Sequence, residues 1–459
     1  MSVASSLRLA PARAPVAVAV GAGIALLATA ITLAAGTLAL AVPLIVVAIY
    51  LLVKHPPVLL ALFVFVPYFE SAPGIRAIPF DPTAALAALL LAVCAVHVLK
   101  AGFQMPPMGF LVPAGIIGIF MLLGLADTPD PGYGREKAEK FFTVTLLAAL
   151  APFALLRSKQ AMRQFLWAIV AGAVVVAALT PVLEPTVAPG IATEYDTKGR
   201  YSFGGQIFPA RFLCTGALIL FLVPGLLTGR RRFLAVPAAV AISVVALGFG
   251  ARGPVAAFAA TLVAVAAISA LRSPRQLAMV LVAVAAAAAA LPFVAVPGSA
   301  AGRLARAAND PVATLRGDNR YLLYEQALEL FRRSPVVGAG TGGYAAYSGI
   351  VSPPRQLLRY PHNIFLELGA ENGFVPVLAF LFMVVGGVVA LMRRVIAADD
   401  RETRQLLTIL LGLLILNFLS TQVSGDINDN RTTLTTLAIA WMVGRDGLQG
   451  AAGAGKGAA

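Results

Sequence analysis

Residues 363–392, NIFLELGAENGFVPVLAFLFMVVGGVVALM, form a long apolar run that Glu367 and Glu371 interrupt only near its start. From Phe374 to Met392 the run contains no charged residue. About 20 consecutive apolar residues suffice for a helix to cross a hydrocarbon core of roughly 30 Å. The run therefore predicts a membrane-spanning segment, and it must be helical because backbone amides in lipid need internal partners.

The composition of the whole chain agrees with this stretch. Of 459 residues, 59% are hydrophobic and only 12% are charged. A soluble globular protein has about 25% charged residues, so this chain has about half of the charge needed to cover a water-facing surface. That excludes a large cytosolic enzyme, a disordered protein and a collagen-like or coiled-coil rod.

Apolar segments of similar character recur along the sequence. They predict an all-α, polytopic integral membrane protein with 12–14 transmembrane helices, folded as a single domain over residues 1–459. The first apolar segment follows Arg8 and Arg13 and resembles a signal peptide, but we interpret it as an uncleaved span because many spans follow it. The predicted spans are 16–35, 37–53, 56–69, 82–99, 107–125, 141–156, 165–184, 209–228, 233–250, 254–271, 277–298, 363–392, 405–421 and 433–444.

The net charge of +14 is scattered in short clusters between the apolar runs, so it indicates topology rather than nucleic-acid binding. Clusters such as Arg230–Arg232 and Arg393-Arg394 are expected in the cytoplasm. The opposite, periplasmic side then receives the loops 70–81, 126–140, 185–208, 299–362 and 422–432, and the short turn 251–253. The loop 299–362 should be partly helical, from Arg320 to Phe331, and should carry part of the active site. Residues 446–459 are expected to be a disordered cytoplasmic tail.

His362 is the one histidine of three that this topology places on the outer side. Asn363 follows it, and Glu367 and Glu371 come within the next helical turns. A histidine at a membrane edge is often only a helix cap. Ionisable residues that enter a span are costly, however, and are functional candidates by default. We therefore expect His362 to be catalytic, with Asn363 and Glu371 in contact with the substrate.

Arginines on the same outer side run against the positive-inside bias and so require an explanation. Guanidinium groups bind phosphate oxygens in bidentate fashion, and as a set these arginines suit a diphosphate. The alternative for each one is an ion pair with Asp426, Asp429 or Glu371. The candidate ligands of a diphosphate are Arg200, Arg211, Arg252, Arg320 and Arg431.

A neutral imidazole beside such a pocket suits one reaction type. The histidine removes a proton from an acceptor hydroxyl, while the arginines stabilise a departing diphosphate. The donor is expected to be a lipid-linked sugar, because nucleotide sugars are absent outside the membrane. No metal-ligand spacing is present in the sequence, so neither a metal nor another cofactor is expected. The segment Gly338-Ala339-Gly340-Thr341-Gly342-Gly343 spells a dinucleotide fingerprint, but it lacks the strand–helix context and we expect a flexible turn.

At these residues the sequence resembles the O-antigen ligase and O-antigen polymerase family. The resemblance covers roughly residues 190–445, with Ala251 standing where many relatives have Ser. The matching motifs are Gly199-Arg200, Arg252-Gly253, Arg320-Tyr321-Leu322-Leu323-Tyr324, Ser334-Pro335-Val336-Val337-Gly338-Ala339-Gly340, Pro361-His362-Asn363 through Gly373, and Asp426 through Arg431.

The resemblance implies a membrane glycosyltransferase that acts on undecaprenyl-diphosphate-linked oligosaccharides at the periplasmic face of the bacterial inner membrane. It implies His362 as the base or as the residue that orients the acceptor. It implies Arg200, Arg252 and Arg320 as the leading diphosphate contacts and Arg211 as a further candidate. The expected partners are the lipid-linked glycan, an acceptor glycan, the lipid bilayer and, for a polymerase, a chain-length regulator.

Three functions remain open from the sequence. A polymerase transfers the growing glycan to the next lipid-linked repeat, and we favour it because polymerases are the more numerous family members. A ligase transfers finished glycan to lipid A-core and needs the same base and pocket. A transporter of lipid-linked glycans would explain the spans but would leave the outer histidine without a role.

Overall fold

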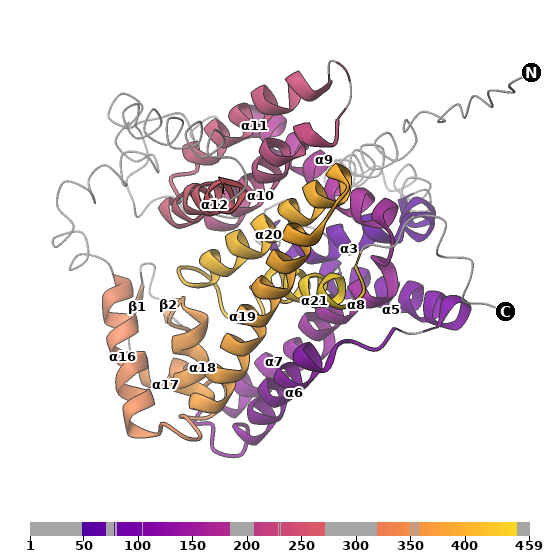
Figure 1. The fold of residues 1–459 in the computed structure, drawn as a ribbon. Coiled ribbons are helices and arrows are strands. Elements are labelled where there is room, and N and C mark those ends of the chain that lie inside the picture. Colours follow the sequence, from indigo (N-terminus) through magenta and orange to yellow (C-terminus); the bar gives the residue numbers. More distant parts are fainter. Residues whose placement is uncertain are drawn as a thin grey trace, which may run out of the picture.

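The computed structural model describes residues 48–69, 78, 80–102, 104–183, 206–227, 229, 231–270, 319–348, 351–352, 356–357 and 359–447 (Figure 1). The described chain is helical almost throughout. Its longer elements are α3 (Pro56–Phe65), α5 (Pro82–Ala101), α6 (Met108–Leu123), α7 (Pro131–Lys140), α8 (Leu146–Leu155), α9 (Lys159–Leu183), α10 (Ile207–Leu222), α11 (Arg231–Gly248), α12 (Arg252–Ala270), α16 (Asn319–Arg333), α18 (Ile364–Asn372), α19 (Phe374–Ala397), α20 (Arg401–Thr421) and α21 (Arg431–Asp446). Short elements are the 3₁₀ turns Val66–Phe69 and Val223–Gly225, helix α17 (Gly343–Ser348) and the two-residue strands β1 (Val351–Ser352) and β2 (Gln356–Leu357), which pair antiparallel.

Several of these helices are long and apolar enough to cross a membrane, so the prediction of an all-α polytopic membrane protein is confirmed. Within the described residues there are five such helices, or six if the bent pair Ala48–Lys54 and Pro56–Phe69 is one span. Four more are apolar but shorter: Met108–Leu123, Ile207–Leu222, Phe233–Gly248 and Arg252–Ile268. The predicted spans 16–35 and 277–298, and most of the tail 446–459, lie outside the described residues.

Trp441 shows how the small residues of this sequence allow close helix packing. A Cβ on Gly109 of α6 or on Gly386 of α19 would lie only 2.2 or 2.3 Å from its indole ring. The indole Nε1 donates a hydrogen bond to the carbonyl oxygen of Met383 (2.9 Å). Glycine at both positions therefore leaves room for the indole of Trp441, which packs between α6, α19 and α21. Small residues are common where membrane helices pack closely.

The second part of the predicted outer loop 126–140 is helical. Residues Pro131–Lys140 form α7, which continues through a π-helical turn, Phe141–Thr145, into α8. Asp130 caps the start of α7 by accepting a hydrogen bond from the amide of Tyr133 (3.1 Å). The polar sequence of α7 hides its helical phase, because Gly134, Lys137 and Ala138 are buried on the side that Phe141 continues.

The predicted span 363–392 is also divided. Gly373 adopts a φ of 83° and separates α18 from α19. The ring of Phe365, near the start of α18, lies 5.4 Å from that of Phe380 in α19 and 6.1 Å from that of Phe418 in α20. The chain thus runs out along α18, turns at Gly373 and returns along α19 as a helical hairpin. Figure 1 shows α16, α17 and α18 grouped at this end of the molecule.

The glycine-rich segment 338–343 is a packed turn and not the flexible one that the sequence predicted. Gly338, Gly340 and Gly342 all have positive φ angles, between 73° and 87°. A Cβ on Gly338 would lie 2.2 Å from the backbone carbon of Glu371, and one on Gly340 would lie 2.6 Å from the Cα of Thr128. The glycines are needed here because backbone approaches backbone.

Candidate functional site

The turn at Gln422 and Val423, directly after α20, joins three chain segments that carry predicted site residues. The carbonyl oxygen of Gln422 accepts hydrogen bonds from Nδ2 of Asn363 (3.2 Å) and from the hydroxyl of Tyr324 (3.1 Å). Val423 lies against Gly253. A Cβ on Gly253 would lie 3.0 Å from Cγ2 of Val423.

Each of these three neighbours of the turn adjoins a predicted functional residue. Asn363 follows His362 and Gly253 follows Arg252, while Tyr324 lies four residues after Arg320 and so on the same side of α16. The fold therefore gathers the backbone segments of His362, Arg252 and Arg320 around one turn, although 110 residue positions separate Arg252 from His362.

His362 adopts an unusual backbone conformation. Its φ is 59°, the one positive value among the described non-glycine residues, and histidine tolerates this region better than most side chains. Asn363 caps α18 by accepting hydrogen bonds from the amides of Phe365 (3.0 Å) and Leu366 (3.1 Å). The ring of Tyr360 meets the imidazole edge to face at 4.7 Å. The imidazole is thereby held at the start of α18, where the side-chain oxygen of Asn363 caps the helix.

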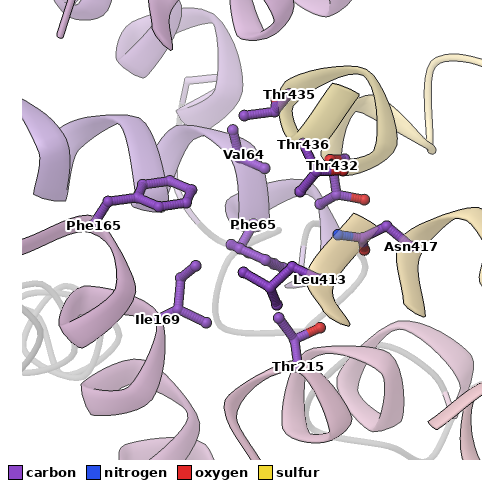
Figure 2. A pocket seen from close by; sticks show the side chains of 10 residues that line it. All are labelled: Val64, Phe65, Phe165, Ile169, Thr215, Leu413, Asn417, Thr432, Thr435 and Thr436. Carbon is purple, nitrogen blue, oxygen red and sulfur yellow. Dashed lines mark hydrogen bonds between the residues drawn. The ribbon is translucent and has the colours of Figure 1, made fainter. Parts of the chain in front are cut away.

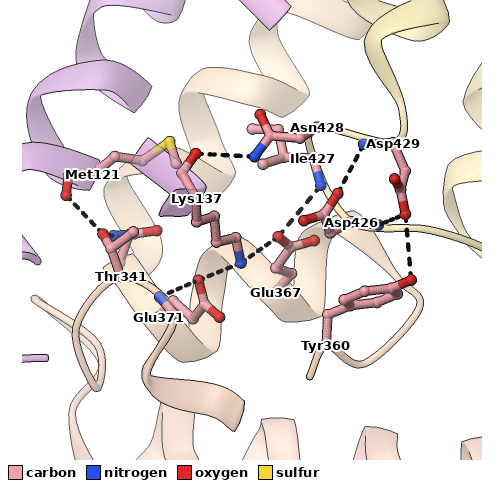
Figure 3. A network of polar contacts seen from close by, with 12 residues as sticks. Met121, Lys137, Thr341, Tyr360, Glu367, Glu371, Asp426, Ile427, Asn428 and Asp429 are labelled. Atoms are coloured by element: carbon pink, nitrogen blue, oxygen red, sulfur yellow. Dashed lines mark hydrogen bonds and ion pairs between the residues drawn. The ribbon is translucent and has the colours of Figure 1, made fainter. Parts of the chain in front are cut away.

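Tyr360 connects the histidine to a pair of carboxylates in the turn before α21, outside the spans (Figure 3). Its hydroxyl donates to Oδ2 of Asp429 (3.3 Å), and the amide of Asp429 donates to Oδ1 of Asp426 (2.8 Å). Burial, followed by the charge of Asp426, raises the pKa of Asp429 to about 7. The charge of Asp429 in turn raises the pKa of Tyr360 well above its ordinary value. Tyr360 therefore stays a neutral hydrogen-bond donor.

A buried ion cluster fixes the other face of α18 (Figure 3). Nζ of Lys137 lies 2.6 Å from Oε1 of Glu367 and 2.6 Å from Oε2 of Glu371, and all three side chains are 1% exposed. Backbone amides complete the cluster: Ile427 donates to Glu367 (3.3 Å) and Gly342 donates to Glu371 (3.0 Å). The sequence predicted that Glu371 contacts substrate or pairs with an arginine. In the structure its partner is Lys137, so its role is internal.

Arg211 lies inside the helix bundle and is fully buried. Its guanidinium donates to Oδ1 of Asn430 (2.6 Å) and to the hydroxyl of Thr432 (2.9 Å), with longer contacts to Asn417 and Thr433 at 3.4 Å. It thereby joins α10 to α20 and α21. This position argues against the predicted contact with a diphosphate.

Arg431 is buried as well. Its Nε donates to the carbonyl oxygen of Asn428 (3.2 Å), and its guanidinium lies 6.0 Å from the ring centre of Phe63. Both contacts are internal, so Arg431 also fits the predicted diphosphate contact poorly. Arg200 lies outside the described residues.

A small cavity beside the Arg211 cluster has a volume of about 10 Å³, which is room for one water at most. It is too small for a sugar, and its threonine and asparagine side chains belong to the bundle interior. Figure 2 shows the lining residues Val64, Phe65, Phe165, Ile169, Thr215, Leu413, Asn417, Thr432, Thr435 and Thr436.

Sequence reasoning missed Lys137, Tyr360 and Gln422. Lys137 could have been found by extending the helical phase of the span at 141–156 backwards, because Gly134, Lys137 and Phe141 then share one side. Tyr360 stands two residues before His362, but its aromatic ring carries no pattern of its own. Nothing in the sequence marks Gln422, since its part in the site is a backbone carbonyl.

Comparison with known families supports the resemblance inferred from the sequence. A family described as O-antigen ligase matches residues 237–381. The match includes Arg252, Arg320 and His362, and it confirms the resemblance to the O-antigen ligase and polymerase family over this region. It indicates a glycosyltransferase-like enzyme of the ligase or polymerase type. A search of curated proteins finds no match.

Proposed function

We propose that this chain transfers a glycan from a lipid diphosphate carrier to the hydroxyl group of an acceptor sugar. The observation that carries this proposal is the meeting of the His362, Arg252 and Arg320 segments around the turn at Gln422 and Val423. A proton acceptor and two permanent cations on neighbouring segments supply what transfer from a diphosphate requires.

In the proposed step, His362 takes the proton of the acceptor hydroxyl as its oxygen attacks the anomeric carbon of the donor sugar. The bond from that carbon to the diphosphate oxygen breaks, and the electron pair leaves with the lipid diphosphate. Arg252 and Arg320 neutralise the charge that develops there, and Arg200 is a further candidate. Asn363 and Glu371 position α18, and we assign Arg211 and Arg431 to the helix bundle.

We further propose undecaprenyl diphosphate as the carrier and the periplasmic face of the bacterial inner membrane as the place of reaction. The first candidate activity is polymerisation of lipid-linked repeat units, with a chain-length regulator as partner. Ligation to lipid A-core is the second candidate, favoured by the description of the family that matches residues 237–381.

The test uses purified full-length protein and an undecaprenyl-diphosphate-linked repeat unit, in parallel samples with and without EDTA. A ladder of products from the repeat unit alone indicates a polymerase, whereas transfer only after lipid A-core is added indicates a ligase. His362→Ala should abolish either product. The matched control is His97→Ala, because the His97 ring bonds to the carbonyl oxygen of Val93 within its own helix, α5 (3.1 Å). No transfer to either acceptor would contradict the proposal and favour a transporter, and loss of transfer with EDTA would contradict metal independence.

A further inference from the structure

An exposed pair of valines follows α16. Val336 and Val337 are 56% and 57% exposed, at the end of the sequence Arg332-Arg333-Ser334-Pro335-Val336-Val337. The sequence places this stretch in an extramembrane loop, where two adjacent exposed valines are an unfavourable apolar surface. Such residues mark a place of interaction when they are part of a larger contiguous apolar patch.

The turn that carries the valines touches the first residue of a candidate span. The amide of Phe374 donates to the carbonyl oxygen of Pro335 (2.8 Å), and a Cβ on Gly373 would lie 2.0 Å from the carbonyl oxygen of Val336. From this point along α19 runs a stripe of exposed apolar side chains whose spacing places them on one face of the helix. The stripe consists of Phe374, Leu378, Leu381, Phe382, Val385 and Val389.

The end of α6 meets the same corner. The carbonyl oxygen of Phe120 accepts from Nδ2 of Asn372 (3.2 Å), and that of Gly124 accepts from the amide of Thr341 (3.0 Å). In this last turn of α6, Leu122 and Leu123 are also exposed. The valine turn therefore adjoins exposed apolar side chains at the ends of two helices.

Two arginines precede the valines in the sequence. Arg332 and Arg333 are exposed, and Arg333 pairs with Glu329 one turn earlier in α16. Long basic side chains beside an apolar surface place their charge among lipid headgroups while their aliphatic parts stay near the hydrocarbon. Such residues are attracted to anionic lipids.

We propose that the turn at Val336 and Val337 inserts into the bilayer beside Phe374, with Arg332 and Arg333 among anionic headgroups. The turn then anchors α16 and α18 to the membrane surface. The bilayer occupies this surface because the surface continues the lipid-facing sides of α19 and α6.

The anchor is also joined to the candidate site through α18 and α19. Phe365, three residues after His362, packs against Phe380, which is six residues beyond Phe374 along α19. Six residues of helix span about 9 Å. His362 is thus held at a fixed distance from the anchor.

The experiment places an environment-sensitive fluorophore on Val336→Cys in full-length protein. The native Cys94 and Cys214, both buried, are replaced by alanine. The protein is reconstituted into vesicles of phosphatidylcholine and phosphatidylglycerol with nitroxide groups on their acyl chains. Leu378→Cys is the control for a lipid-facing position, and the exposed Glu325→Cys of α16 is the control for water.

The expected result is a blue-shifted emission at Val336→Cys, quenched by the acyl-chain nitroxide as at Leu378→Cys and protected from aqueous iodide. Quenching by iodide as strong as at Glu325→Cys would overturn the proposal. So would protection from both quenchers, which would indicate a second protein chain on this surface. With phosphatidylcholine alone, Arg332→Gln with Arg333→Gln should match the wild type; in the mixed vesicles the double variant should show a weaker blue shift than the wild type.

Discussion

At the scale of single residues, His362 stands in the left-handed region of backbone conformation, with a φ of 59°. A residue with a Cβ loses about 1–2 kcal/mol in the left-handed region relative to its preferred conformations. Such strain persists where the surroundings fix it, and it is frequent at functional sites. Here Asn363 and Tyr360 fix it from both sides. The left-handed conformation keeps His362 outside α18, which begins at Ile364.

This conformation predicts that glycine is a more stable replacement than alanine at position 362, the reverse of their order within a helix. The free energy of unfolding of His362→Gly should be about 1 kcal/mol higher than that of His362→Ala, because glycine adopts a φ of 59° without strain. Within helix α5 the order should be the ordinary one, with His97→Ala more stable than His97→Gly by about 1 kcal/mol. Apparent melting temperatures in detergent measure all four variants. The same order at both positions would show that His362 is not strained.

Asp429 predicts a pH dependence of stability. Its folded-state pKa of about 7 lies above its ordinary value of 3.8, so the folded protein holds this proton more tightly than the unfolded chain does. The stabilisation is complete below about pH 4 and is lost as the pH rises through 7. Asp426 and Arg431 are the charged groups that act on it, with opposite signs.

Asp429→Asn removes this titration. Between pH 5 and pH 8, the wild type should therefore lose more thermal stability than the variant does. Melting curves at four pH values in this window provide the measurement. Parallel curves for the two proteins would contradict the assignment.

At the scale of elements, the cluster around Lys137 joins α7 to α18. Two carboxylates and one ammonium group share a site that water does not reach. Removing one partner from a buried ion pair costs about 3–5 kcal/mol, because the remaining charge stays buried and unpaired. The cluster therefore holds α18, and with it His362, in a single position.

Lys137→Met should accordingly lower the apparent melting temperature strongly. Lys140→Met is the matched control on the same helix, since Lys140 is 57% exposed and pairs with Glu136 on the surface, where a pair contributes at most about 1 kcal/mol. Adding Glu367→Gln and Glu371→Gln to Lys137→Met should recover much of the loss. An equal effect of the two lysine variants would refute the role of the cluster.

Two glycines with the same φ of 73° separate conformational strain from packing. Gly338→Ala brings a Cβ within 2.2 Å of the backbone of Glu371, whereas a Cβ on Gly102 would meet nothing within 4 Å. Gly102→Ala should cost about 1–2 kcal/mol from strain alone. Gly338→Ala should cost clearly more and should loosen the turn 338–342 from α18. Thermal unfolding of both variants measures the difference, and equal losses would show that the turn is not tightly packed.

At the scale of the whole molecule, apolar patterning was sufficient for the fold class but not for element boundaries. The helical period continues across Gly373, so the sequence alone joins α18 to α19. The polar residues of α7 look like a loop because the partners of Lys137 are more than 200 positions away. These boundaries depend on tertiary contacts that no local pattern contains.

The candidate site was predictable in its charged residues and not in its supports. Arg252, Arg320 and His362 stand out because their charge and topology are unusual, and their proposed roles stay predictions. Arg211 has the same sequence signal but lies in the bundle interior. Burial among Asn430, Thr432 and Asn417 cannot be distinguished from exposure by sequence alone, because these partners lie in α20, α21 and the turn between them.

The most direct test of the central claim separates donor binding from transfer. Binding of an undecaprenyl-diphosphate-linked glycan and single-turnover transfer are measured for wild type, His362→Ala, Arg252→Ala and Arg320→Ala. Arg163→Ala is the control, since Arg163 pairs with Glu402 away from the turn at Gln422. We predict that His362→Ala binds the donor as the wild type does but transfers at least about 100-fold more slowly. Each arginine variant should weaken donor binding and slow transfer by about 100-fold to 1,000-fold. Transfer at the wild-type rate by His362→Ala, with donor binding intact, would contradict the account.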